Sequence, residues 1–315
     1  MSGSDYSPFF LSYRPLNSLH PNNLPSALPR GWAAGKLGLV VSAPGPEGVV
    51  VSGVNTEDVG RKSRNRCREM AYASSTSLGV RLTEGEGNLP KLVLTSPAGS
   101  EAEIYLFGGF ITSWKVPSGK DLLFVRPDAV FNGNKPISGG VPHCFPQFGP
   151  GPIQQDGPYS CTVWDFSFHA LFKVTLNAKS LATELTVKNT DNKAFSFSTT
   201  LHTYFQASVS NASVKGLKGC KTLNKDPDPK NPVEVVTFPG FVDCAYLDAS
   251  SELQLDNGLG DLISIKNTVY AVLWNPYLQM EACYKDFVCV ENAKIGSVQL
   301  EPEQTWTAVQ HLSIA

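Results

Sequence analysis

The fold class is decided by the stretch Ala182-Thr183-Glu184-Leu185-Thr186-Val187, in which apolar and polar residues alternate. Successive side chains of a β-strand point to opposite faces, so this alternation is typical of a strand with one buried face. The same β-leaning character recurs along the chain in short runs at 90–95, 101–107, 121–125, 165–176, 195–205, 253–255, 263–266, 269–274, 287–290 and 306–312. These runs predict a protein built from many short strands.

Turn-forming residues separate the runs, at 96–99, 116–120, 189–193 and 256–258. The last of these, Asp256-Asn257-Gly258, is a tight-turn signal between two strands. No segment keeps a 3.6-residue apolar stripe over three turns, and no internal repeat is visible. Regularly spaced strands with Gly, Pro and Asn turns predict an all-β sandwich or barrel.

Composition narrows the class of protein. Of the 315 residues, 42% are hydrophobic and 17% charged, which is enough apolar material for one large β domain or two small ones. The formal net charge of −2 gives no basic field for nucleic acid or a membrane surface, and no apolar run reaches the length of a membrane span. The seven cysteines show no CxxC pair, so we expect no zinc site and a reducing compartment. A small neutral or anionic molecule is the expected partner.

The first 75 residues differ from the rest of the chain. They are rich in Ser, Pro, Gly and Asn, Asp5 is the one acid before Glu47, and a basic cluster follows at 61–68. An acid-poor leader of this kind is typical of an organelle transit peptide, but an unselected extension ahead of an older start at Met70 is the alternative. We therefore expect a disordered leader at 1–75 and a β domain at 76–315, located in the cytoplasm or a plastid.

Four polar residues stand out as candidates for chemistry. His202 shares a strand face with Tyr204, and Glu291 ends the apolar run 287–290. A buried carboxylate there would have its pKa raised into the range of a general base, whereas a structural histidine and an exposed strand end are the plain alternatives. Asp243 follows a Phe-Pro-Gly turn and could accept sugar hydroxyls or simply cap that turn. For His143, in a rigid Gly/Pro-rich loop, burial is favoured over ligand binding.

Taken together, several motifs resemble one family, the aldose 1-epimerases, and most closely the plant members of its glucose-6-phosphate 1-epimerase branch. The motifs are Lys-Pro-Ile-Ser-Gly-Gly-Val-Pro at 135–142, Phe-Pro-Gln-Phe-Gly at 145–149, Leu-His-Thr-Tyr-Phe at 201–205, Trp-Asn-Pro at 274–276 and Val-Cys-Val-Glu-Asn at 288–292. The resemblance covers about residues 79 to 315. It implies a galactose-mutarotase-like super-sandwich of two large, mostly antiparallel sheets.

The same resemblance implies a function and its residues. His202 and Glu291 match the catalytic histidine and glutamate, and Asp243 and Gln155 match substrate-binding residues. The implied reaction interconverts the α and β anomers of a hexose 6-phosphate, with Glu291 as base at O1 and His202 as acid at the ring oxygen. No metal or cofactor, a hexose phosphate as the small-molecule partner, and a monomer are expected.

The chain also departs from the family pattern. After Gln155 it lacks a segment that carries a substrate-binding arginine, and Ser138 replaces a second arginine, so that Lys135 is the nearest remaining cation. Glu303 stands in place of a turn glycine, where a left-handed backbone disfavours a side chain. A non-catalytic carbohydrate-binding paralogue and an unstable, mis-spliced product therefore remain as alternatives to the enzyme.

Overall fold

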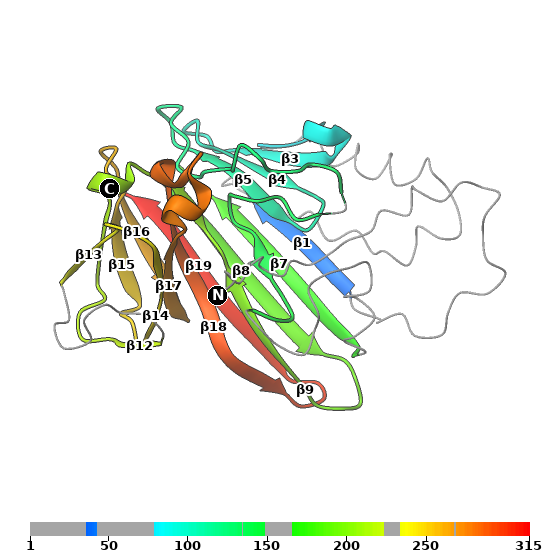
Figure 1. Cartoon of the computed structure of the whole chain (residues 1–315). Coiled ribbons are helices and arrows are strands. Elements are labelled where there is room, and N and C mark those ends of the chain that lie inside the picture. The colour runs from blue at the N-terminus through cyan, green and yellow to red at the C-terminus, as the bar shows by residue number, and fades with distance from the viewer. Residues whose placement is uncertain (1–35, 43–78, 134, 149–165, 224–233, 268) are drawn as a thin grey trace.

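The structure, a computed structural model, describes residues 36–42, 79–133, 135–148, 166–223, 234–267 and 269–315. Nearly all the regular structure in these ranges is β (Figure 1). The helices are single short turns, η3 (Glu86–Asn88), η5 (Val209–Asn211), η6 (Tyr277–Met280) and η7 (Tyr284–Asp286). None of the helices in the described residues has the length and apolarity needed to cross a bilayer.

The larger of the two main sheets has eight strands. In spatial order they are β1 (Lys36–Ser42), β7 (Phe168–Leu176), β8 (Ser180–Asn189), β19 (Thr305–Ile314), β16 (Leu262–Asn267), β15 (Glu252–Asp256), β11 (Ser213–Lys215) and β13 (Val235–Thr237). Every pair is antiparallel except β1 with β7, which run parallel. The alternating stretch 182–187 forms the middle of β8, whose burial alternates residue by residue as predicted.

The second main sheet has seven strands. Six follow the order β12 (Lys221–Leu223), β14 (Val242–Leu247), β17 (Tyr270–Asn275), β18 (Phe287–Leu300), β9 (Phe195–Leu201) and β6 (His143–Cys144), and β10 (Tyr204–Gln206) pairs with β18. A separate four-stranded sheet contains β2 (Val80–Glu84), β3 (Pro90–Thr95), β4 (Glu101–Tyr105) and β5 (Phe110–Lys115). It lies at one end of the two large sheets (Figure 1).

The core lies between the two large sheets. Inward residues of the first sheet, such as Val174 and Leu312, join one apolar cluster with Leu273 and Val290 of the second. On the other face of the second sheet a smaller aromatic cluster forms around Tyr204, Phe287 and Cys289. The prediction of an all-β sandwich of two large, mostly antiparallel sheets is confirmed.

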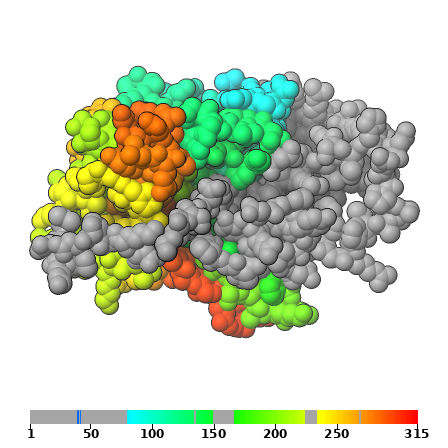
Figure 2. All heavy atoms as spheres, viewed as in Figure 1, coloured from blue at the N-terminus to red at the C-terminus, as the bar shows by residue number. Residues whose placement is uncertain are grey.

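Contacts between distant segments cover part of the outer face of the second sheet. In Figure 2 the orange atoms, in the range of η6 and η7, lie beside green atoms from a much earlier part of the chain. Phe124 stacks on Phe287 there, with ring centroids 5.0 Å apart. The loop from β5 therefore packs over the start of β18, on the face that carries the aromatic cluster.

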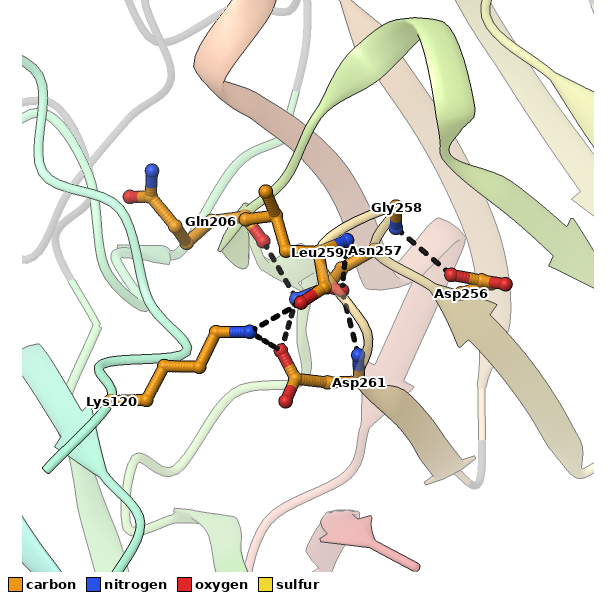
Figure 3. Close-up of polar contacts among 7 residues, drawn as sticks. All are labelled: Lys120, Gln206, Asp256, Asn257, Gly258, Leu259 and Asp261. Atoms are coloured by element: carbon orange, nitrogen blue, oxygen red, sulfur yellow. Dashed lines mark hydrogen bonds and ion pairs between the residues drawn. The ribbon is translucent and has the colours of Figure 1, made fainter. Parts of the chain in front are cut away.

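A network of hydrogen bonds and one ion pair connects the β15–β16 turn to the turn after β5 (Figure 3). Asn257 is fully buried, and its amide donates to the carbonyl of Gln206 and to Asp261 while its oxygen accepts from two backbone N–H groups. Lys120 Nζ lies 2.5 Å from Asp261 Oδ2 and donates to the carbonyl of Leu259 at 2.8 Å. The predicted tight turn at 256–258 is thus a five-residue loop, built around one amide.

Three details differ from the sequence expectation. Seven residues of the predicted disordered leader form β1; the other residues of 1–75 lie outside the described part of the chain. Strand β18 runs on to Leu300, so Glu291 lies inside a strand rather than at its end. Asp243 lies in β14 rather than in the turn before it. Glu303 does adopt the left-handed conformation, with φ of 67°.

Candidate active site

One face of the second sheet gathers the polar candidates into a row. In an antiparallel sheet, residues opposite each other in the register point to the same face. The register pairs Asp243 of β14 with Trp274 of β17, Trp274 with Cys289 of β18, and Cys289 with Tyr204 of β10. Glu291 follows Cys289 by two residues and therefore points the same way. This set defines the site face, opposite the main core.

His202 reaches this face from the short break between β9 and β10. Its backbone N–H donates to the carbonyl of Pro142 at 3.0 Å, which ties the break to the loop before β6. The imidazole stacks on Tyr204 with ring centroids 4.8 Å apart and lies edge-on to Trp274 at 5.4 Å. These two rings fix the plane of the imidazole, and its Nε2 lies 3.2 Å from Oε1 of Glu291.

Both members of the pair are buried. His202 is 7% exposed and Glu291 2%. Burial lowers the pKa of His202 to about 3, because a charged imidazole loses its hydration. Burial also raises the pKa of Glu291 well above its usual value, and the nearby charge of Asp243 raises that pKa further. Both directions favour a single proton on the pair at neutral pH, with the imidazole neutral.

Thr200 supports the carboxylate from the neighbouring strand β9. Its hydroxyl lies 3.1 Å from the carbonyl of Asn292 and 3.5 Å from Oε2 of Glu291. The hydrogen bond to the carboxylate lowers the pKa of Glu291, but less than burial and Asp243 raise it. Asp243 is half-buried across Trp274 from the pair, where it could accept hydrogen bonds from a bound hydroxylated ligand.

Comparison with known proteins identifies the family of this chain. The sequence profile of the aldose 1-epimerase family matches residues 90–165 and 155–313. The chain belongs to the aldose 1-epimerase family. A protein of Cenchrus ciliaris named "Putative glucose-6-phosphate 1-epimerase" is 29% identical over 278 residues, covering 71% of this chain and 84% of that protein.

Solved structures of other proteins show a similar fold. A crystal structure titled as a putative mutarotase (YeaD) from Salmonella typhimurium aligns with a TM-score of 0.66 at 23% identity, covering 75% of this chain and 94% of that one. A galactose mutarotase-like protein from Lactobacillus casei aligns with a TM-score of 0.53 at 13% identity, covering 75% of this chain and 100% of that one. The fold is therefore galactose-mutarotase-like, and membership supports an isomerase acting on sugar anomers at the level of the family.

Within this aldose 1-epimerase sandwich, three of the four residues predicted for the site lie on or beside the site face. His202 and Glu291 are in direct contact, and Asp243 is close enough for its charge to act on Glu291. Gln155 lies outside the described residues. So does the stretch directly after it, where the family resemblance indicates that a segment is absent. Lys135, expected as the nearest cation, is exposed.

Arg126 is a cation near the site face that the sequence analysis did not identify. Its backbone N–H donates to the carbonyl of Ser138 at 3.0 Å, so it lies directly across from the position where the family resemblance led us to expect an arginine. Its guanidinium binds Asp128 through two hydrogen bonds, of 2.9 and 2.5 Å. Its positive charge lowers the pKa of Tyr204 and of Cys289, opposing the larger effect of burial. No motif marked Arg126; only the pairing with Ser138 reveals it.

His143 has a structural role in this fold. It is 1% exposed, lies edge-on to Phe172 with ring centroids 3.9 Å apart, and neither ring nitrogen has a hydrogen-bond partner. Burial lowers its pKa to about 3. The predicted burial of His143 is confirmed. Among the described residues, no group of three or more His, Cys, Asp or Glu side chains could hold a metal ion.

A pocket of about 820 Å³ opens at the edge of the site face. Its lining includes Gln206, Phe238, Leu259, Tyr277, Tyr284 and Lys285, but not His202, Glu291 or Asp243. The acid–base pair and this pocket are therefore separate features. The pocket lining also carries ionisable side chains, Tyr277, Tyr284, Lys285 and Asp286. We assign the chemistry to the pair because its imidazole and carboxyl are in direct contact and burial shifts the pKa of each.

Proposed function

We propose that this chain interconverts the α and β anomers of a hexose 6-phosphate, glucose 6-phosphate being the first candidate. The observation that carries the proposal is the 3.2 Å contact between His202 Nε2 and Glu291 Oε1 in a buried setting. Anomer exchange moves protons at two oxygens, O1 and the ring oxygen, which are both bonded to the same carbon. Two proton-exchanging groups must therefore lie side by side, as these two do.

The proposed reaction needs one proton on the pair. The carboxylate of Glu291 takes the proton from O1, His202 donates a proton to the ring oxygen, and the bond between C1 and the ring oxygen breaks to give an aldehyde. Rotation about C1–C2 presents the other face, and reclosure reverses both transfers. The resting neutral pair reaches the required charged form by moving one proton from carboxyl to imidazole across their contact. No oxidation or reduction occurs.

Arg126 supports a phosphorylated substrate over a neutral sugar. A guanidinium is always charged at neutral pH, and its planar fork matches a phosphate with two parallel hydrogen bonds. Its partner Asp128 is largely exposed, with 64% of its side-chain surface accessible, so a substrate phosphate could compete for the guanidinium. Asp243, on the other side of the pair, is suited to accept sugar hydroxyls.

A second candidate function is carbohydrate binding without catalysis. The observation that favours it is the near-complete burial of His202 and Glu291, together with a pocket that contains neither residue. A sugar held in that pocket would not contact the pair. The two candidates differ in one measurable respect, since only the first accelerates anomer exchange.

The test is magnetisation exchange between the α and β anomeric protons of glucose 6-phosphate at equilibrium, followed by NMR with purified full-length protein. The proposal requires exchange faster than in protein-free buffer and loss of that acceleration in Glu291→Gln. Folded protein that binds the sugar phosphate without accelerating exchange would instead support the binding function. An equal rate for the wild type and Glu291→Gln would point to a contaminating enzyme and count against the proposal.

A further inference from the structure

A buried polar network lies directly behind the acid–base pair. Adjacent residues of a strand point to opposite faces, so Asn292 points into the main core while Glu291 points to the site face. The side-chain amide of Asn292 donates to Oε1 of Gln310, which lies on β19 of the opposite sheet. Asn267 donates to Oδ1 of Asn292 at 2.6 Å. The residue that follows Glu291 is thus held from the other sheet.

The same glutamine also reaches the residue that follows His202. Gln310 Nε2 donates to Oγ1 of Thr203 at 3.4 Å, and Thr203 has no exposed surface. The carbonyl of Thr203 accepts from the N–H of Val290, one residue before Glu291, at 3.2 Å. One side chain therefore contacts the immediate neighbours of both members of the pair.

Breaking these hydrogen bonds would leave buried polar groups without partners, which costs free energy. The network therefore favours one relative position of the strands that carry it. Gln310 is 1% exposed and Asn292 4%. A buried amide that loses its partners keeps the full cost of its desolvation, so the network favours one arrangement of the two strands. A displacement of about 1 Å in reacting groups costs about 100-fold in rate, so a restraint behind the pair matters for chemistry.

We propose that Gln310 is a positioning residue that sets the separation of His202 and Glu291 from the opposite sheet. It touches neither member of the pair and acts through Asn292 and Thr203. The inference rests on the proposed function for its kinetic consequence. Its structural consequence, a changed environment of the His202 ring, does not depend on activity.

The test compares Gln310→Met with two matched controls in the full-length protein. Methionine keeps the length of the side chain and removes its hydrogen bonds to Asn292 and Thr203. Thr183→Val removes the hydroxyl that lies opposite Gln310 in the β8–β19 register and has no hydrogen-bond partner. Leu312→Val makes a small cavity two residues along β19 on the same buried face, so it reports loss of stability alone.

We expect Gln310→Met to lower kcat for anomer exchange by about 10- to 100-fold with KM changed less than about twofold. Both controls should stay within about twofold of the wild type. Equal kcat in Gln310→Met and the controls, or a change in KM alone, would overturn the positioning role. Should Gln310→Met fail to fold, Thr203→Val breaks the link at its other end without a change in volume and should lower kcat in the same direction.

A second readout separates this inference from the proposed function. In ¹⁵N-histidine NMR spectra, with His202 assigned by its loss in His202→Asn, Gln310→Met should shift the Nε2 signal of His202, and the controls should not. A wild type without exchange activity would sink the proposed function but leave this comparison intact. An unshifted His202 signal in Gln310→Met would sink the positioning role, whatever the activity.

Discussion

His202 Nε2 lies 3.2 Å from Glu291 Oε1, although the two residues are 89 positions apart in the chain, one in the break between β9 and β10 and the other in β18. The contact is made in a place where both side chains are almost entirely removed from solvent. Buried ionisable groups have pKa values that differ from those of exposed groups. Shifted pKa values of this kind are what a general acid and a general base require.

Glu291→Gln should abolish most of the exchange activity. The amide keeps the volume of the carboxyl but cannot take up or release a proton, and general acid–base groups contribute about 100- to 10,000-fold to rate. The measurement is anomer exchange by NMR at equal protein concentration, with thermal unfolding to show that the variant is folded. Thr186→Val, on the outer side of β8, is the matched control and should retain wild-type activity. Retained activity in Glu291→Gln would contradict the assignment of the pair.

Arg126→Gln should weaken binding of hexose phosphate and leave a neutral hexose unaffected. Loss of a charged hydrogen-bond donor costs about 1.5–3 kcal/mol, which corresponds to a rise in KM of roughly 10- to 150-fold. The check is the KM for glucose 6-phosphate beside the exchange rate of glucose. Lys91→Gln, which removes a cation paired with Glu103 in the four-stranded sheet, serves as the control. An equal loss with both sugars would show that Arg126 acts on the fold and not on the phosphate.

Asn257→Ala should destabilise the fold by about 2–4 kcal/mol, because it leaves several buried polar groups around the β15–β16 turn without partners. Lys120→Met, which breaks a partly exposed ion pair to the same turn, should cost no more than about 1 kcal/mol. Urea unfolding of the two variants checks the order. A larger loss in Lys120→Met would mean that the ion pair, and not the buried amide, holds the turn.

His143→Leu should reduce the sensitivity of folding to acid. Burial lowers the pKa of His143 from 6.5 to about 3, so below about pH 6.5 the unfolded chain gains a proton that the folded chain does not. The free energy of unfolding therefore falls as the pH falls through this range. Between about pH 7 and pH 5.5 the variant should lose about 1 kcal/mol less than the wild type, measured by urea unfolding at both pH values. Identical losses would show that His143 is protonated in the folded protein.

Much of the fold was predictable because strand periodicity is a local signal. The run at 90–95 coincides with β3, and the runs at 182–187 and 306–312 lie inside β8 and β19. Strands with weaker alternation were missed, including β5, whose residues are buried on both faces except for Lys115 at its end. The end of β18 was also misjudged, since the polar residues after Val290 resemble a strand terminus although the ladder continues.

Only the site residues that lie in recognisable sequence motifs were predictable. His202, Glu291 and Asp243 lie in short recognisable stretches, and the register brings them together. Arg126 and Gln310 carry no motif of their own. Each is placed by a neighbour that is distant in the sequence, Arg126 by Ser138 and Gln310 by Asn292 of the opposite sheet. Cross-strand register and sheet packing are properties of the folded chain, which a linear pattern does not contain.

Strand β1 has a consequence for where the polypeptide can be shortened. It lies in register with seven consecutive residues of β7, and its Val41 is fully buried in the main core. A chain beginning at Met70 would lack this strand and would present the backbone N–H and C=O groups of β7 to any extended partner, including another copy of itself. Because β1 is itself the outer strand of the eight-stranded sheet, its removal moves the open edge of that sheet to β7 and does not create a new one. The burial of Val41 is lost with it, so we expect the shortened chain to unfold at a lower urea concentration than the full-length chain.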